Sequence, residues 1–186
     1  MHTVALPDLN YLKECFVLDP LLPCGLRWAD DRPLSHFKTE RGYKIWKKKY
    51  SNKPCGSMST HKYFITELSS QDYSNHRIIF AIYNNTINFQ DKNIDHIDGN
   101  SLNNSPENLR LATASQNSFN SKKRKDNTTG YKNIQCRKDK EIGKFIVRLQ
   151  LNGKFIRVGS YKTLEEALQV RDSKLKEMVG EFYRTI

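Results

Sequence analysis

The sequence lacks any long apolar run, any closely spaced cysteine pair and an even balance of charge. No apolar segment approaches the roughly 18–20 residues that span a bilayer, and Met1–Asn10 has no signal-peptide pattern. We therefore expect a cytoplasmic protein that does not enter a membrane. Cys15, Cys24, Cys55 and Cys136 form no C-x-x-C pair, which favours reduced thiols. A zinc site built from the first three cysteines is the alternative.

The deficit of acidic residues is concentrated at one end of the chain. The 186 residues carry 31 Lys and Arg against 20 Asp and Glu, a formal net charge of +11. Residues 121–186 hold 17 basic and 8 acidic residues, whereas residues 1–120 hold 14 and 12. A basic segment beside a nearly neutral one favours a polyanionic partner, with nucleic acid first and a membrane surface second. No basic amphipathic helix with a wide apolar face supports the second.

The first 50 residues predict short elements. Asp8–Val17 predicts a helix, because its apolar residues have helical spacing and Asp8 can act as N-cap. Leu26–Trp28 predicts a short extended segment. Tyr43–Tyr50, YKIWKKKY, interleaves aromatic residues with lysines and predicts a strand. That strand would either touch phosphate or be an edge strand that its lysines keep solvated.

A hairpin and a buried helix are predicted next. Gly56–Leu68 contains the alternation of a hairpin. Asn75–Asn85, NHRIIFAIYNN, predicts a short buried helix because its isoleucines recur at helical spacing. His76, near the start of this helix, suits either a packing or capping role, or a role as ligand or phosphate contact.

The stretch Ile94–Asn117, IDHIDGNSLNNSPENLRLATASQN, is dense in polar residues that carry chemistry. Its pattern predicts the order strand, loop, strand and helix. The first strand carries Asp95-His96 between Ile94 and Ile97, and a tight turn at Asp98–Asn100 opens a loop rich in asparagine. Leu109–Ala112 is the second strand and Ala114 to about Ser121 the helix, with Thr113 as its N-cap.

Four residues of this stretch suit the hydrolysis of a phosphodiester. A hard divalent cation takes oxygen ligands, which Asp95 and the side-chain oxygen of Asn117 supply. His96, beside such a cation, can accept a proton from water near neutral pH. Asn108 can hold the histidine-bearing loop through bonds to backbone groups. Taken singly, each residue is more often a turn residue; their joint spacing favours a nuclease.

This spacing resembles the HNH endonuclease motif of phage and intron-encoded homing enzymes. The matching residues are Asp95-His96, Gly99, Asn108-Leu109 and Asn117, and NHRIIFAIY resembles the helix that leads into the motif. The resemblance implies a ββα-metal (His-Me finger) fold with His96 as general base, Asn108 orienting it, and Asp95 and Asn117 holding the ion. It implies Mg²⁺, with Mn²⁺ as the alternative. The family often has histidine at the last position, so Asn117 would be a weaker ligand.

After the motif the chain becomes basic and then changes to a strand pattern. Residues 122–130 contain no apolar residue and predict a solvated linker, or one that also follows phosphates between two DNA-bound parts. Three short runs follow from Tyr131, separated by turns that include Asn152-Gly153. A helix is predicted from about Thr163 to Val179, with Gly180 as its stop. These features predict a three-stranded antiparallel sheet packed on one helix.

The middle run places two kinds of side chain on opposite faces of this sheet. Val147 and Leu149 alternate with Arg148 and Gln150, so one face packs on the helix and the other is basic. A free basic sheet face fits the major groove of DNA. A solvated face without a DNA role is the alternative.

This C-terminal part resembles the Apetala-two (ethylene-response-factor) DNA-binding domain of plants. The resemblance covers Gly130-Tyr131, NGKFIRVGSYKTLEEAL and Gly180-Glu181-Phe182, and that domain also occurs joined to HNH nucleases. The DNA-binding residues that it implies are Lys132, Gln135, Arg137, Lys144, Arg148, Gln150 and Arg157. Two family tryptophans are absent, near Ile142 and Arg157, and a short insertion lies around Asp139–Glu141. The fold therefore carries over, but the target sequence does not.

We predict an α+β protein with three segments. Residues 1–121 form the HNH nuclease domain with an N-terminal extension (motif core 75–121), residues 122–130 a basic linker, and residues 131–186 the Apetala-two-like domain. The expected activity is metal-dependent DNA cleavage of the homing type, in the host cytoplasm if a phage encodes the protein. The expected partner is double-stranded DNA, with no membrane and no obligatory protein partner; a nicking monomer is expected and a dimer is the alternative. A DNA-binding regulator without activity is the second hypothesis.

Overall fold

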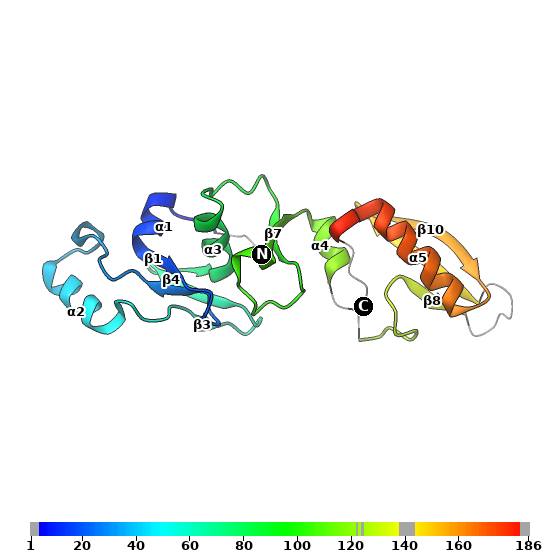
Figure 1. The fold of residues 1–186 in the computed structure, drawn as a ribbon, viewed down its shortest axis with the longest axis horizontal. Coiled ribbons are helices and arrows are strands. Elements are labelled where there is room, and N and C mark those ends of the chain that lie inside the picture. Colours follow the sequence, from blue (N-terminus) through cyan, green and yellow to red (C-terminus); the bar gives the residue numbers. More distant parts are fainter. Residues whose placement is uncertain (1–3, 122, 124, 138–143, 183–186) are drawn as a thin grey trace. The chain divides into compact units, whose positions relative to one another are not determined.

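The structure, a computed structural model, describes residues 4–121, 123, 125–137 and 144–182. The chain forms two compact units, Met1–Leu111 and Ala112–Ile186, and both contain helices and antiparallel strand pairs (Figure 1). The predicted mixed class is confirmed. Asp139–Glu141 and Ile142, where the sequence indicated an insertion and a missing tryptophan, lie outside the described residues. No helix in the described part of the chain is long and apolar enough to cross a bilayer.

The first unit begins with a helix and a two-stranded sheet. α1 (Leu9–Cys15) starts after Asp8, whose Oδ1 accepts a hydrogen bond from a backbone N–H of the first turn at 2.8 Å. β1 (Phe16–Leu18) pairs antiparallel with β2 (Leu26–Trp28). The helix predicted to reach Val17 was therefore too long, because pairing with β2 places Phe16 in the core and overrides local helical spacing.

α2 (Glu40–Tyr50) occupies the segment for which a strand was predicted, so that prediction was wrong. The Thr39 side chain caps the helix by accepting a backbone N–H of the first turn. Trp46 packs edge-on against Trp28 of β2, with ring centroids 5.9 Å apart, and Tyr50 lies 6.5 Å from the same ring. The aromatic residues that suggested a strand therefore occupy one face of a helix.

A three-stranded antiparallel sheet lies next to α3 (Asn75–Tyr83). Its strands, in spatial order, are β3 (Ser57–Met58), β4 (Phe64–Leu68) and β5 (Gln71–Ser74). The β3–β4 pairing confirms the predicted hairpin, whereas β5 was not predicted. The predicted helix is confirmed by α3, in which Ile78 and Ile79 are fully buried.

The side chain of Asn75 joins several segments of the first unit. Its Nδ2 donates to the backbone oxygens of Cys24 at 2.9 Å and Cys55 at 3.0 Å, and its Oδ1 accepts from Thr66 Oγ1 at 2.7 Å. Asn75 is fully buried, so these bonds satisfy polar atoms that water does not reach. They fix the first turn of α3, in which His76 lies.

The central stretch has the predicted order of strand, loop, strand and helix. β6 (Asn93–His96) and β7 (Leu109–Ala112) form a two-stranded sheet, and α4 (Ala114–Asn120) follows. Thr113 forms a reciprocal capping box with the glutamine three residues later, which confirms the predicted N-cap. The boundary between the compact units falls before α4, which the sequence grouped with the motif core 75–121.

The second unit contains a three-stranded antiparallel sheet covered by one helix, as predicted. Its strands are β8 (Ile134–Cys136), β9 (Phe145–Leu151) and β10 (Lys154–Tyr161), in the spatial order β10-β9-β8. α5 (Leu164–Val179) contributes Ala167 and Leu175 to a core that includes Val147 and Leu149 (Figure 1). The apolar face predicted for the middle strand is therefore the face that packs.

Two predicted chain reversals are present in the second unit. Asn152 and Gly153, which join β9 to β10, have φ values of 48° and 78°, the combination that a type I′ turn requires. Gly180 ends α5 with φ 54°. Short 3-10 helices elsewhere in the described chain are η1 (Leu34–His36), η2 (Pro106–Asn108) and η3 (Gly180–Phe182).

Candidate active site

His96 is the last residue of β6, and only 6% of its surface is exposed. Its Nε2 lies 3.2 Å from Asn104 Oδ1. Because that oxygen accepts, the bond favours the tautomer with its proton on Nε2, which makes Nδ1 the basic nitrogen. The ring lies 5.3 Å from the ring of His76 and 6.2 Å from that of Tyr63, centroid to centroid. Three segments of the first unit therefore hold the imidazole.

His76 packs against the candidate base. Its ring lies 5.3 Å from Tyr63 as well as 5.3 Å from His96. Burial lowers the pKa of His76 to about 3, and the neighbouring His96 and Arg77 act in the same direction. His76 is therefore neutral at physiological pH and adds no positive charge beside His96. Of the two roles open from the sequence, packing is the one that the contacts display.

The depressed pKa of His76 predicts pH-dependent stability. The imidazole gains its proton near pH 6.5 in the unfolded chain but only near pH 3 in the folded chain. Stability is therefore highest above the unfolded value and falls as the pH drops through this window, by up to about 1.4 kcal/mol per pH unit. His76→Phe, which keeps an aromatic ring, should flatten the slope between about pH 6.5 and 4.5 in urea unfolding. The exposed His61→Gln is the control, and an unchanged slope in His76→Phe would contradict the assignment.

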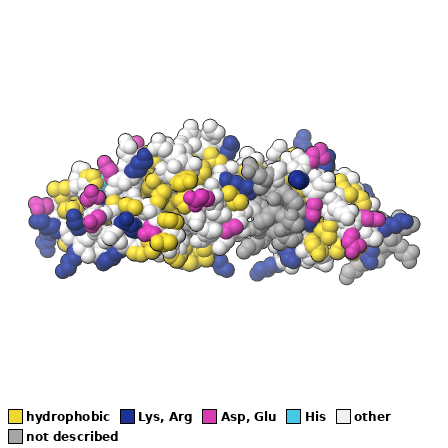
Figure 2. All heavy atoms as spheres, viewed as in Figure 1, with side chains coloured by type: hydrophobic (Ala, Val, Ile, Leu, Met, Phe, Trp, Pro, Cys, Tyr) yellow, Lys and Arg dark blue, Asp and Glu magenta, His cyan; other side chains and the backbone are white. Residues whose placement is uncertain are grey.

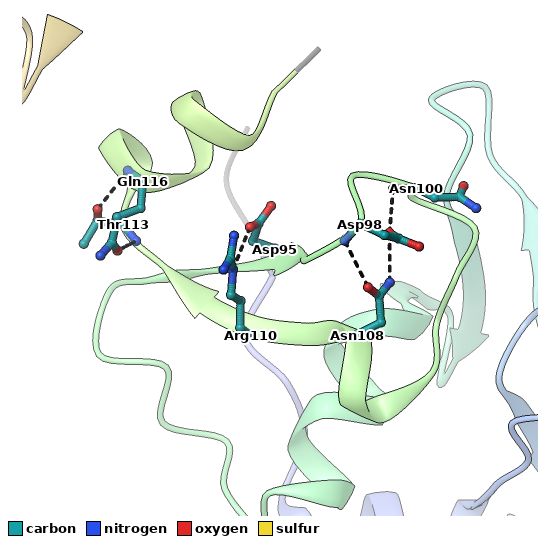
Figure 3. A network of polar contacts seen from close by, with 7 residues as sticks. All are labelled: Asp95, Asp98, Asn100, Asn108, Arg110, Thr113 and Gln116. Atoms are coloured by element: carbon teal, nitrogen blue, oxygen red, sulfur yellow. Dashed lines mark hydrogen bonds and ion pairs between the residues drawn. The ribbon is translucent and has the colours of Figure 1, made fainter. Parts of the chain in front are cut away.

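Asp95 precedes His96 in β6 and bonds a cationic side chain of β7. Arg110 Nε lies 3.1 Å from Asp95 Oδ2, and the two side chains are 14% and 6% exposed (Figure 3). The carboxylate therefore lies where a positive charge is stabilised. We did not predict this role of Arg110 from the sequence. Its position in the second predicted strand was the one sign that it could face Asp95.

Asn108 fastens the loop that follows His96. Its Oδ1 accepts from the Asp98 backbone N–H at 3.1 Å, and its Nδ2 donates to Asp98 Oδ1 at 3.0 Å (Figure 3). The same Nδ2 donates to the Asn103 backbone oxygen at 2.8 Å. Bonds of this kind to the loop backbone are what the sequence predicted for Asn108. They join the turn after β6 to the residue that precedes β7.

From the sequence, Asp98 was predicted only to form a turn; in the structure its carboxylate accepts several hydrogen bonds. Its carboxylate accepts from the Asn100 backbone N–H at 2.8 Å and from Asn108 Nδ2 at 3.0 Å (Figure 3). It also accepts from Asn103 Nδ2 at 2.8 Å. Partial burial alone would raise the pKa of Asp98, but the hydrogen bonds from Asn103, Asn100 and Asn108 hold it below its ordinary value. A charged acceptor therefore organises the asparagines of this loop.

The residues predicted to hold a metal come from both units: Asp95 lies in the first and Asn117, in α4, in the second. No group of three or more His, Cys, Asp or Glu side chains in the described ranges is placed to hold a metal ion. A carboxylate and an amide oxygen are hard donors, and Mg²⁺ often takes only one or two carboxylates, completed by waters and substrate phosphates. In donor chemistry alone, a carboxylate such as that of Asp95 and an amide oxygen such as that of Asn117 therefore suit a divalent ion.

The cysteines named as an alternative zinc site are buried in the first unit. Burial raises the pKa of Cys15 to about 11 and also raises that of Cys55, so both are thiols rather than thiolates. Cys15 Sγ lies 3.8 Å from His36 Nδ1. Within the described residues this histidine and the cysteines do not make up a group of metal ligands.

Arg148 and Arg157 lie side by side on the sheet of the second unit. They are directly opposite each other in the β9–β10 pairing, so their side chains share a face, and both residues are exposed. Arg157 Nη2 also donates to Ser160 Oγ at 2.6 Å. Like charges directly opposite one another are unfavourable by themselves. A bound anion such as a phosphate would relieve that repulsion.

The face that carries this arginine pair is partly covered. A cavity of about 800 Å³ lies against it, lined by residues of the sheet, of α4 and of the segment that follows α4. Five of the predicted DNA-binding residues line it, namely Lys132, Gln135, Arg137, Arg148 and Gln150. Ile146 of the same strand face is only 5% exposed, so the predicted free face is narrower than expected. Lys144 is exposed at the edge of the described range, where its backbone oxygen accepts from the Arg137 N–H at 2.7 Å.

Lys132, predicted to contact DNA, has its ammonium group at the end of α4. Its Nζ donates to the backbone oxygens of Ser118 at 3.0 Å, Phe119 at 3.0 Å and Ser121 at 2.6 Å. Carbonyls at a helix C-terminus lack intrahelical partners and favour a cation. A DNA contact by Lys132 would have to replace these bonds. The sequence did not indicate these bonds, because the linker separates Lys132 from α4.

Comparison with known proteins identifies relatives for this region. Residues 73–119 match the HNH endonuclease family. Protein 3.8 of Escherichia phage T7 is 38% identical over 91 residues, which cover 49% of this chain and 73% of that protein. The uncharacterized HNH endonuclease L560 of Acanthamoeba polyphaga mimivirus is 36% identical over 107 residues, which cover 58% of this chain and 54% of that protein. The match thus spans about half of the mimivirus protein. No solved structure matches the chain significantly.

Proposed function

We propose that this chain, which belongs to the same family as Protein 3.8 of Escherichia phage T7 and contains an HNH endonuclease domain, is a metal-dependent DNA endonuclease of the homing type. The observation that carries the proposal is the extent of the family match. Residues 73–119 include Asp95, His96, Asn108 and Asn117, the set whose chemistry suits phosphodiester hydrolysis.

In the proposed reaction His96 accepts a proton from a water molecule. The water oxygen forms a bond to phosphorus as the bond to the 3′-oxygen breaks on the opposite side. The leaving oxygen takes a proton from solvent, which gives a 3′-hydroxyl and a 5′-phosphate. A divalent ion held by Asp95 and Asn117, Mg²⁺ or alternatively Mn²⁺, would offset negative charge on the phosphate and on the leaving oxygen.

The neighbours of His96 position the base. Asn104 Oδ1 holds Nε2 at 3.2 Å and so directs Nδ1 toward proton transfer. Asn108 fixes the loop that begins at His96, and the rings of Tyr63 and His76 restrict the imidazole on other sides. A general base held in this way loses little orientation when substrate binds.

The finer parts of the proposal concern the fold and the DNA contacts. The proposed ββα-metal fold would consist of β6, β7 and α4, and Asn117 of α4 would be the second ligand of the ion. The second unit, with its Apetala-two-like order of three strands and a helix, would hold the enzyme on double-stranded DNA. The opposed pair Arg148 and Arg157 supports this assignment, because two exposed positive side chains lie together on one face of the sheet.

Plasmid cleavage tests the activity. Supercoiled plasmid incubated with the protein and Mg²⁺ should be converted to the nicked form, and to the linear form if the protein acts as a dimer. EDTA should abolish the conversion. DNA carrying the protein's own source locus must be included, because homing enzymes act at chosen sites. If none of these DNAs is cleaved with either Mg²⁺ or Mn²⁺, the proposed nuclease activity is wrong.

A DNA-binding regulator without activity is the second candidate. The arginine pair on β9 and β10 favours it, because this feature requires none of the candidate catalytic residues. DNA binding in EDTA with no cleavage under any metal would select the regulator over the nuclease.

The arginine pair itself yields a prediction. Arg148→Gln together with Arg157→Gln should weaken duplex binding and lower the dependence of log affinity on log salt by about 2, since each lost phosphate contact lowers it by nearly 1. Fluorescence anisotropy from 50 mM salt upward gives both quantities. Lys174→Gln with Lys176→Gln, on α5, removes the same charge from the covering helix. Equal effects of the two double variants would show that overall charge, and not the sheet face, is responsible.

A further inference from the structure

The positive charge of the first unit is gathered in one segment. Residues 38–53, which include α2, hold seven of the 14 Lys and Arg residues of residues 1–111 but only one of the 12 Asp and Glu. The remainder of the unit holds 7 basic and 11 acidic residues, a net charge of −4. The seven basic residues are Lys38, Arg41, Lys44, Lys47, Lys48, Lys49 and Lys53. DNA that approaches this unit would therefore be attracted at α2 and repelled on average elsewhere.

α2 separates its aromatic residues from part of its charge. Tyr43 and Trp46 pack on Phe37, with centroids 5.4 Å and 5.3 Å apart. Arg41, Lys44 and Lys48 fall at the spacing of another helix face and are exposed. Figure 2 shows Lys and Arg side chains, in dark blue, gathered at the end of the first unit that α2 forms. The charges therefore lie on a face that the rest of the unit does not use.

A buried cation fixes α2 in place. The Arg32 guanidinium carbon lies 4.9 Å from the Trp46 ring centre, 5.0 Å from that of Phe37 and 5.4 Å from that of Trp28. Only 6% of Arg32 is exposed. Cation–π contacts of this kind are favourable when the cation is removed from water. α2 is therefore anchored on a rigid aromatic base and presents its charges at fixed positions.

The basic side chains of α2 differ in their contacts with neighbouring side chains. Lys44 Nζ lies 2.6 Å from Glu40 Oε1, and Lys47 Nζ donates to Tyr43 Oη at 3.2 Å. The ion pairs found among the described residues include neither Arg41 nor Lys48. An exposed ion pair such as that of Lys44 stabilises little and is readily exchanged for a stronger anion.

We propose that α2 is a second DNA-binding surface, which holds the phosphate backbone of double-stranded DNA through Arg41, Lys44 and Lys48. From Arg41 to Lys48 the helix rises about 10 Å, a length over which one strand of B-DNA presents about three phosphates. Lysine is a flexible point charge, which suits phosphates rather than base edges. The surface therefore supplies affinity without sequence preference. The inference rests on the proposed DNA substrate and adds a contact made by the first unit.

A membrane surface fits α2 less well. The aromatic residues of α2 pack on the unit, and the exposed large apolar side chain between its charges is Ile45, 58% exposed. Interfacial helices need a wide apolar face opposite their charges.

The test compares two charge-matched triple variants of the full chain. Arg41→Gln, Lys44→Gln and Lys48→Gln remove the proposed contacts; Lys13→Gln, Lys174→Gln and Lys176→Gln remove equal charge from α1 and α5. Both are made in a His96→Ala background and measured in EDTA, so that cleavage does not interfere. Duplex DNA binding is followed by fluorescence anisotropy from about 50 to 300 mM KCl. The α2 variant should lose about 2 to 3 from the salt slope and at least about tenfold in affinity near 100 mM, and the control little of either.

Several outcomes would overturn the proposal. An unchanged slope and affinity in the α2 variant would do so, as would equal losses in both triple variants. Stronger competition by polyglutamate than by unlabelled duplex would assign the helix to an acidic protein instead. Circular dichroism and the melting temperature report folding, and Lys48→Gln alone, expected to lower the slope by about 1, gives a milder test. If the protein cuts no DNA but the α2 variant loses DNA binding, the proposed nuclease activity is wrong and this inference still holds.

Discussion

Replacing His96 with alanine is expected to slow DNA cleavage by about 10²–10⁴-fold and to leave DNA affinity nearly unchanged, because a positioned general base contributes a factor of this size. Among the described residues, no imidazole beside His96 is suited to take over the task. His76 is the imidazole that packs on His96, and its pKa of about 3 makes it a poor proton acceptor in solution near neutrality. The loss should therefore appear in the rate at saturating enzyme and not in binding.

Single-turnover conversion of supercoiled plasmid with Mg²⁺ measures this effect. His61→Ala is the matched control, since His61 is exposed and belongs to the same unit. Added imidazole should restore part of the rate of His96→Ala, because a small base can occupy the space that the side chain leaves. A folding defect would not be rescued in this way. Cleavage by His96→Ala at the wild-type rate would refute the base while leaving the enzyme intact.

The central stretch could be predicted from the sequence because its signals are local. The Thr113 capping box lies within four residues, and Asn108 bonds a turn that begins ten residues earlier. Each such signal depends on residue types at short spacing, which a sequence displays directly. The order of β6, β7 and α4 followed from these signals alone.

α2 could not be predicted because its residues satisfy two patterns. Aromatic residues and lysines alternate loosely in YKIWKKKY, as in an edge strand, while Tyr43, Trp46 and Tyr50 also lie at helical spacing. The choice is made by distant partners. Trp28 and Arg32 contact Trp46, Trp28 also contacts Tyr50, and Phe37 contacts Tyr43, so the helix places all three rings on one aromatic and cationic surface. Tertiary packing decides such ambiguous segments.

The residues that surround His96 could not be predicted for the same reason. Tyr63 and His76 contact His96 from 33 and 20 residues earlier in the sequence. Separations of this length leave no periodic pattern from which the contacts could be predicted. Arg110 faces Asp95 only through the pairing of β6 with β7. The sequence thus indicated candidate groups for the chemistry, whereas the fold determines which groups surround them.

Replacing Asp95 with asparagine should reduce metal-supported cleavage at least about 100-fold, because the variant loses the only proposed ligand that carries a charge. The amide keeps the size of the side chain and an oxygen that Arg110 Nε can still bond, so the fold should persist. Loss of the charge from this largely buried pair should lower the free energy of unfolding by about 1–2 kcal/mol. Denaturant unfolding measures that cost separately from activity.

Asp98→Asn is the control that separates binding an ion from holding the loop. Asp98 lies three residues after Asp95 and accepts bonds from Asn103 and Asn108, so its loss should lower the rate at every metal concentration without moving the midpoint of the metal titration. Asp95→Asn should move that midpoint to higher Mg²⁺ or Mn²⁺. Electron paramagnetic resonance of Mn²⁺ should show the same weakening without any substrate turnover. If Asp95→Asn binds Mn²⁺ as the wild type does, Arg110 is the functional partner of that carboxylate and the ion lies elsewhere.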